Sequence, residues 1–125
     1  MRVLIVDDQE FIRRGIRAAL VVAPEIDVCG EATDGLDAIE KAMRLKPDVV
    51  LMDISMPGID GLDGTRQLRR LLPEIQVVTV SQYDDVPGLV KEALDAGAAT
   101  HVSKVFIWDR LVTTLRNLQT TSKAS

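Results

Sequence analysis

The sequence predicts an α/β protein built on a doubly wound, five-stranded parallel sheet in the order 2-1-3-4-5. Two features of the chain lead to this prediction. Short apolar runs alternate five times with segments of helical period, which is typical of strand–helix repeats. The runs LIV and DVVLM lack polar alternation, as expected for strands covered by helices on both faces. Right-handed crossovers restrict the topology, and 2-1-3-4-5 is the natural order for five strands.

The first half of the chain contains three predicted strands and two predicted helices. Strands are expected at residues 2–6, 26–30 and 48–52. A helix at residues 9–22 ends before Pro24. Its apolar face consists of Ile12, Ile16, Ala19 and Leu20. A second helix is capped by Asp34 and stopped by Pro47. The residues that it is expected to bury are Ala38, Ile39, Ala42 and Met43.

The second half continues the alternation with two strands and three helices. A helix follows the loop at residues 54–60 and runs to about Leu72. Strands are expected at residues 76–80 and 100–103, separated by a helix from residue 85 or 86 to Ala96 that ends at Gly97. The last helix is expected at residues 107–118, anchored by Phe106 and Trp108, and residues 120–125 are expected to fray. Its inward residues are Leu111, Leu115 and Leu118.

Composition excludes several classes of protein. The net charge of -4 is wrong for a nucleic-acid-binding domain, which usually carries a basic excess. Cys29 is the single cysteine and His101 the single histidine, so neither a disulfide nor a Cys/His zinc site is expected. Aromatic residues make up 3% of the chain, so the core is aliphatic. No apolar run approaches the roughly 20 residues of a membrane span, and a reducing cytoplasmic setting is expected.

Four of the five strands are followed by polar side chains at the same edge of the sheet. Asp7 and Asp8 follow the first strand, Asp53 the third, Ser81 the fourth and Lys104 the fifth. In a doubly wound sheet, ligands bind beyond the carboxyl ends of the strands at the topological switch point, which lies between the first and third strands here. The five side chains are therefore expected to converge. The alternative for Asp8 is that it caps the following helix.

This set of residues favours phosphorylation of an aspartate. Carboxylates about 4 Å apart repel one another by about 4 kcal/mol at an effective dielectric constant of about 20, and a divalent cation offsets this repulsion. Mg²⁺ uses one or two carboxylates, waters and phosphate oxygens. Lys104 supplies a compact positive charge and Ser81 a hydroxyl donor. An ionised aspartate with this support can form an aspartyl phosphate without a general base.

The order of these motifs resembles a known family. D-D, D-I-S-M-P-G, V-S and K occur in this order, within the flanking text VLIVDDQ, GEATDGLDAIE, KPDVVLMDISMPGIDGL and EALDAGA. The pattern is similar to the receiver domain of two-component response regulators, especially the subfamily with a C-terminal helix-turn-helix of the NarL or LuxR type. The resemblance covers residues 1–118 and implies the flavodoxin-like (βα)5 receiver fold. Residues 119–125 are then a polar tail or the start of a linker to an output domain.

The resemblance implies a role for each site residue. Asp53 accepts a phosphoryl group from a sensor histidine kinase. Asp8 and Asp53 bind Mg²⁺ with help from Asp7, and the backbone carbonyl of Ser55 completes the metal site. Lys104 contacts Asp53 and then the phosphoryl group.

The remaining implied roles concern the switch and the partners. Ser81 moves toward the phosphoryl group. His101 stands where the family often has a Tyr or Phe that swings inward. An imidazole there adds pH sensitivity near its reference pKa of about 6.5, and the alternative is a surface histidine without a role. Tyr83 is expected to shield the phosphoryl group from water. The arginines of the first helix, Arg13, Arg14 and Arg17, form either a solvated face or a docking surface for the kinase.

Signalling by phosphorylation implies dimerisation or control of a transcriptional output domain, with no DNA or membrane contact by this domain itself. The chain then catalyses only its own phosphorylation and dephosphorylation. A pseudo-receiver that binds partners without phosphorylation is the alternative, but such proteins usually lose the acceptor, the acidic pair or the lysine. An aspartyl phosphatase typically needs a second aspartate where Ser55 stands. A flavin carrier needs a Ser-, Thr- and Gly-rich loop where Asp7 and Asp8 stand.

Overall fold

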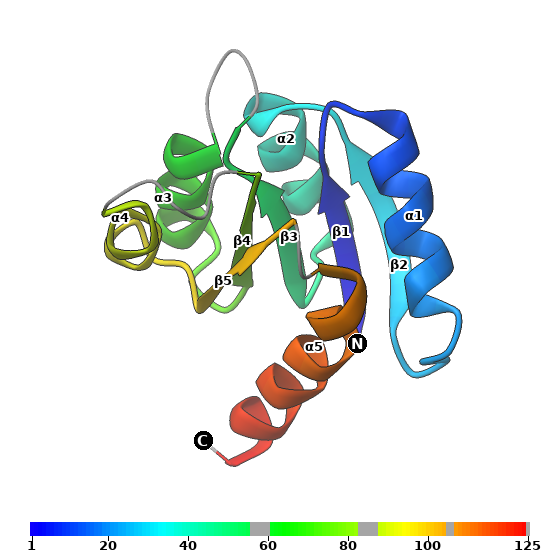
Figure 1. The fold of residues 1–125 in the computed structure, drawn as a ribbon. Coiled ribbons are helices and arrows are strands. Elements are labelled where there is room, and N and C mark those ends of the chain that lie inside the picture. Colours follow the sequence, from blue (N-terminus) through cyan, green and yellow to red (C-terminus); the bar gives the residue numbers. More distant parts are fainter. Residues whose placement is uncertain (56–60, 83–87, 105–106, 125) are drawn as a thin grey trace.

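The computed structural model describes residues 1–55, 61–82, 88–104 and 107–124, with side chains through Leu118. A parallel sheet in the order β2-β1-β3-β4-β5 forms its centre (Figure 1). The strands are β1 Arg2–Val6, β2 Asp27–Ala32, β3 Val49–Asp53, β4 Gln76–Ser81 and β5 Thr100–Ser103. The helices are α1 Glu10–Leu20, α2 Gly35–Leu45, α3 Gly61–Leu71, α4 Leu89–Asp95 and α5 Ile107–Ala124. The predicted fold class and strand order are therefore confirmed.

Two apolar cores lie on opposite faces of the sheet. Helices α1 and α5 cover one face, and α2 and α3 cover the other (Figure 1). Successive residues of β1 alternate between them: Val3 and Ile5 join the core under α1 and α5, whereas Leu4 and Val6 join the core under α2 and α3. All four are buried. This burial on both faces explains why the LIV run shows no polar alternation.

Local sequence signals place α2 as predicted, with one exception. Asp34 is the N-cap, and its side chain accepts a hydrogen bond of 2.8 Å from the backbone amide of Asp37. The helix ends at Leu45, and the next residue, Lys46, takes a left-handed conformation before Pro47. Met43 was expected to be buried, but it is 47% exposed. It lies about 100° around the helix from Ala42, which faces the sheet, and this turn carries its side chain toward solvent.

Several element boundaries differ from the predictions. Strand β2 spans Asp27–Ala32 and β3 reaches Asp53, so each extends further toward the site than expected. Helix α4 begins at Leu89, after Gly88 in a left-handed conformation with φ of 80° that a right-handed helix cannot contain. The predicted start at residue 85 or 86 lies outside the described residues. Helix α5 continues to Ala124 instead of fraying after residue 118, and no Pro or Gly interrupts that stretch.

Helices α1 and α5 are joined by a close aromatic contact. A Cβ atom added at Gly15 of α1 would lie 2.7 Å from the indole Cη2 of Trp108 in α5, so the absence of a side chain there makes room for the ring. This contact supports the expected anchoring of the last helix by Trp108, whereas Phe106 lies outside the described residues. Among the described helices, none is long and apolar enough to cross a bilayer.

Candidate functional site

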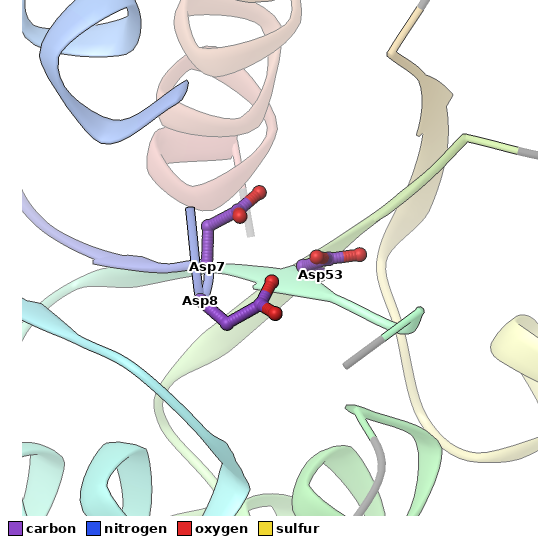
Figure 2. A group of neighbouring side chains, drawn as sticks. All are labelled: Asp7, Asp8 and Asp53. Carbon is purple, nitrogen blue, oxygen red and sulfur yellow. The ribbon is translucent and has the colours of Figure 1, made fainter. Parts of the chain in front are cut away.

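Three carboxylates converge at the carboxyl ends of neighbouring strands. Asp7 and Asp8 follow β1, and Asp53 is the last residue of β3, which pairs directly with β1. One carboxylate oxygen from each residue lies within 4.8 Å of the other two (Figure 2). Asp7 and Asp53 are each 2% exposed, whereas Asp8 is exposed. The cluster therefore combines two buried acids with one that solvent reaches.

Lys104 brings a positive charge to this cluster from the end of β5. Its Nζ lies 2.9 Å from Oδ2 of Asp7 and 3.2 Å from Oδ2 of Asp53, and its side chain is 11% exposed. Burial opposes the charged ammonium, but the hydrogen bond to Asp7 and the charge of Asp53 outweigh burial and raise the pKa of Lys104. The ammonium group is therefore fully charged at neutral pH.

The charged form of Asp53 is stabilised less by this ion pair than the charged form of Lys104, because one ammonium group is shared by two carboxylates. Burial raises the pKa of Asp53 above its ordinary value, and the neighbouring charge of Asp7 adds to this effect. The backbone amide of Ser55, which donates to Oδ1 of Asp53 at 2.9 Å, and the charge of Lys104 oppose the rise without cancelling it. Asp53 is thus a carboxylate with excess local negative charge, which a cation relieves.

Backbone hydrogen bonds fix the two buried acids. The amide of Gln9 donates to Oδ1 of Asp7 at 2.9 Å, and the amide of Asp7 donates to the carbonyl of Ala32 in β2 at 3.0 Å. Gln9 is also the N-cap of α1 and makes no side-chain capping bond, so Asp8 does not occupy the N-cap position. The Asp8 carboxylate instead joins the acidic cluster, and the capping alternative is wrong.

Ser81 and His101 lie in β4 and β5, the two strands at one edge of the sheet. Ser81 is buried at the end of β4, and its carbonyl accepts a 2.8 Å hydrogen bond from the amide of Lys104. His101 of β5 is half-buried, and its Nδ1 lies 2.8 Å from the hydroxyl of Thr79, the residue opposite it in β4. His101 is thus tied to a buried strand residue instead of lying free on the surface. Tyr83 lies outside the described residues.

Comparison with known proteins places the chain in a family. The model of the response regulator receiver domain matches residues 3–116. The chain belongs to this family. It is 45% identical over 104 residues to the response regulator GacA of Pseudomonas viridiflava, an alignment covering 83% of this chain and 48% of GacA. It is 44% identical over 104 residues to protein-glutamate methylesterase/protein-glutamine glutaminase 5 of Myxococcus xanthus, covering 83% of this chain and 30% of that protein.

Solved structures support the same assignment of this receiver domain. The signal receiver domain of NarL from Mycobacterium tuberculosis aligns with a TM-score of 0.87 at 33% identity, covering 94% of each chain. The chain spans half or less of the length of the curated relatives that it matches. Those relatives include transcriptional regulators and methylesterases, so receiver domains of this kind occur beside different output domains.

Sequence reasoning missed two residues that shape the receiver site. Arg13 was expected on a solvated or docking face, yet its Nη1 donates a 2.6 Å hydrogen bond to the carbonyl of Asp7. Gly61 begins α3 directly against the backbone of Asp53. Helical periodicity indicates which face a residue occupies but not which loop the face meets. The available signal was the position of Arg13 only five residues after Asp8, within the first turn of α1.

Gly61→Ala is expected to lower the free energy of unfolding by about 2–3 kcal/mol. A Cβ atom at this position would lie 2.2 Å from the carbonyl oxygen of Asp53 and 2.6 Å from Cα of Ile54, and backbone atoms cannot rotate away. Helix α3 must therefore move off β3. Gly64→Ala is the matched control, because its Cβ would meet the flexible end of Met52 at 3.2 Å. Urea unfolding measures both variants, and equal stability of the two would contradict the expectation.

Proposed function

We propose that this receiver domain accepts a phosphoryl group on Asp53 from a sensor histidine kinase, in a Mg²⁺-dependent reaction in the cytoplasm. The observation that carries the proposal is the setting of Asp53. Its carboxylate is buried, lies within 4.8 Å of two other carboxylates, and faces the Lys104 ammonium at 3.2 Å. This is an acceptor with excess negative charge and a fixed cation beside it, which suits positioning and charge neutralisation.

The donors of the acidic cluster suit Mg²⁺. Asp7, Asp8 and Asp53 offer only hard carboxylate oxygens, the ligand type that this ion prefers. Asp8 is exposed, so water can complete a coordination shell on its side. The carbonyl of Ser55, two residues after Asp53, is the proposed backbone ligand. When bound, the ion would neutralise the charge that accumulates between the carboxylates and the phosphoryl oxygens.

The chain's own groups supply the remaining parts of the transfer. An oxygen of Asp53 forms a bond to phosphorus while the bond from phosphorus to the donor's imidazole nitrogen breaks, and that nitrogen keeps the electron pair. The ionised form of Asp53 is the nucleophile, and it needs no general base. Lys104 neutralises charge on the phosphoryl oxygens, and Ser81 donates its hydroxyl to one of them. The domain in this way catalyses its own phosphorylation and dephosphorylation, and no other reaction.

The signal is proposed to leave the site through β5. Phosphorylation changes the charge beside Lys104, whose amide is bonded to the carbonyl of Ser81. Lys104 directly follows β5, the strand that contacts both α4 and α5, so a rearrangement of Lys104 and Ser81 biases this surface toward dimerisation or contact with an output domain. The transcriptional regulatory proteins among the relatives favour a transcriptional output. Residues 1–118 then form the receiver unit, and residues 119–125 lead toward that output domain.

Intact-mass measurement after treatment with acetyl phosphate tests the proposal. The expected result is one added phosphoryl group when Mg²⁺ is present and none when the ion is chelated, with the group mapped to Asp53 by reductive cleavage. A phosphorylation-independent pseudo-receiver predicts no adduct under either condition. The proposal fails if acetyl phosphate gives no adduct and beryllofluoride, a phosphoryl mimic, also fails to bind.

A further inference from the structure

Arg13 differs from the other arginines of α1 in its surroundings. Its side chain is 13% exposed, although it stands next to Arg14, which is 76% exposed and pairs with Glu10 one turn away. A guanidinium group buried to this extent needs specific partners, because burying an unpaired charge is costly. Its partners therefore indicate what the residue does.

The guanidinium of Arg13 joins the acidic turn to the edge of the sheet. Nη1 donates to the carbonyl oxygen of Asp7 at 2.6 Å, and Nε donates to Oε1 of Glu31 in β2 at 2.7 Å. Glu31 also accepts a hydrogen bond from Arg17 through its second oxygen. Burial disfavours the Glu31 carboxylate, but the bonds from Arg17 and Arg13 outweigh burial and hold its pKa below the usual range. Glu31 is thus a charged, fixed anchor for Arg13.

These contacts act on the part of the backbone that carries two of the three acids. The side chain of Asp7 is held by Gln9 and Lys104, and Arg13 holds its backbone carbonyl. The turn from Asp7 to Asp8 is consequently fixed between α1 and β2. Arg13 bonds to the backbone carbonyl of Asp7 and not to its carboxylate, so this contact does not compete with a cation for a carboxylate oxygen of Asp7.

We infer that Arg13 is a positioning residue of the acidic site: anchored by Glu31, it fixes the turn that carries Asp7 and Asp8 and thereby sets the affinity for a divalent cation. The inference rests on the proposed function, since it concerns the same site. Removing a group that hydrogen-bonds to a metal ligand, and so orients it, typically lowers metal affinity by about 10–100-fold. Saturating cation would refill a weakened site, so a positioning role predicts that phosphorylation recovers at high cation concentration.

The test compares Arg13→Gln with Arg14→Gln, which removes the same charge from the same helix. Calorimetric titration with Mg²⁺ is expected to show a dissociation constant raised about 10-fold in Arg13→Gln and unchanged in Arg14→Gln. The rate of phosphorylation by acetyl phosphate should fall at limiting Mg²⁺ and recover to within about 3-fold of wild type at saturating Mg²⁺. Arg13→Lys keeps the charge but lacks the planar fork, and is expected to restore affinity only in part.

Glu31→Gln is a second variant that tests the same inference if Arg13→Gln does not fold. It leaves Arg13 in place but weakens its anchor, so a smaller rise in the Mg²⁺ dissociation constant is expected. An unchanged dissociation constant in the folded variants, even with lowered stability in EDTA, would overturn the inference and make Arg13 a purely structural residue. The proposed function fails separately: a wild-type chain that binds no Mg²⁺ would overturn both, whereas normal wild-type binding with unaffected variants overturns only the inference.

Discussion

Asp53→Asn is expected to abolish the phosphoryl adduct and, at the same time, to stabilise the fold at neutral pH. The loss follows because an amide is not a nucleophile toward phosphorus. The gain follows because the Asp53 carboxylate is buried beside Asp7 and shares a single ammonium group with it. In the variant, Lys104 keeps Asp7 as its partner. The free energy of unfolding at pH 7 is expected to rise by about 1–2 kcal/mol.

The pH dependence of this gain has a defined sign. Burial and the charge of Asp7 raise the pKa of Asp53 in the folded state, so the folded chain binds more protons than the unfolded chain above pH about 3.9. The stability associated with protonated Asp53 is present below that pH and is lost as the pH rises through the folded-state value. Asparagine does not titrate, so the variant does not lose this stability as the pH rises. The difference in free energy of unfolding between Asp53→Asn and wild type should therefore shrink toward pH 4.

Mass spectrometry after acetyl phosphate treatment and urea unfolding at pH 7 and pH 4 measure both effects. Asp8→Asn is the control for stability, because Asp8 is exposed and its removal relieves little repulsion. A phosphoryl adduct on the Asp53→Asn chain would show that another residue is the acceptor. A variant less stable than wild type at pH 7 would mean that the contacts of Asp53 with Lys104 and Ser55 outweigh its burial.

Lys104→Met is expected to have the opposite effect on stability and to slow phosphorylation by about 100-fold or more. Methionine approximates the aliphatic part of lysine but leaves Asp7 and Asp53 buried without their cation. Removing one partner of a buried ion pair costs about 3 kcal/mol or more at neutral pH. The cost should fall in acid, where the carboxylates become protonated. It should also fall in strong alkali, because the raised pKa of Lys104 means that its contribution in the wild type is lost only above about pH 10.

Urea unfolding across this pH range and single-turnover phosphorylation at saturating Mg²⁺ measure the two effects. Lys91→Met is the matched control, because Lys91 is exposed and pairs with Asp95 of the same helix, α4. Its unfolding midpoint and its phosphorylation rate should equal those of wild type. If Lys104→Met were phosphorylated at the wild-type rate, the ammonium group would have no part in the transfer.

The sheet and the edge that carries the site were predictable because both depend on short patterns. Unbroken apolar runs located the strands, and the residues after each run located the convergence of Asp7, Asp8, Asp53 and Lys104. Details that depend on tertiary neighbours were not predictable in the same way. The spacing of α1 placed Arg13 away from the apolar stripe, but only the folded chain brings Glu31 of β2 up to that face.

Glycines illustrate the same limit. A sequence contains no sign that Gly61 abuts the Asp53 backbone, since the two are eight residues apart and the contact depends on how α3 returns to the sheet. Gly88 follows Pro87, and this Pro-Gly pair is a turn signal that the predicted start of the helix at residue 85 or 86 overlooked. Gly88 takes a left-handed conformation, and α4 begins at Leu89. Met43 was misplaced because α2 buries a narrower stripe than its apolar residues suggest.

The contact of Trp108 with Gly15 makes tryptophan fluorescence an intrinsic probe of this domain. Trp108 is the only tryptophan, so the intrinsic emission at long excitation wavelengths comes from one place. That place is the junction of α1 and α5, four residues beyond Lys104. A half-exposed indole resting on a helix changes its emission when the solvent around it changes. Movement of α5 relative to α1 can therefore be followed in real time without a label, in the unmodified chain.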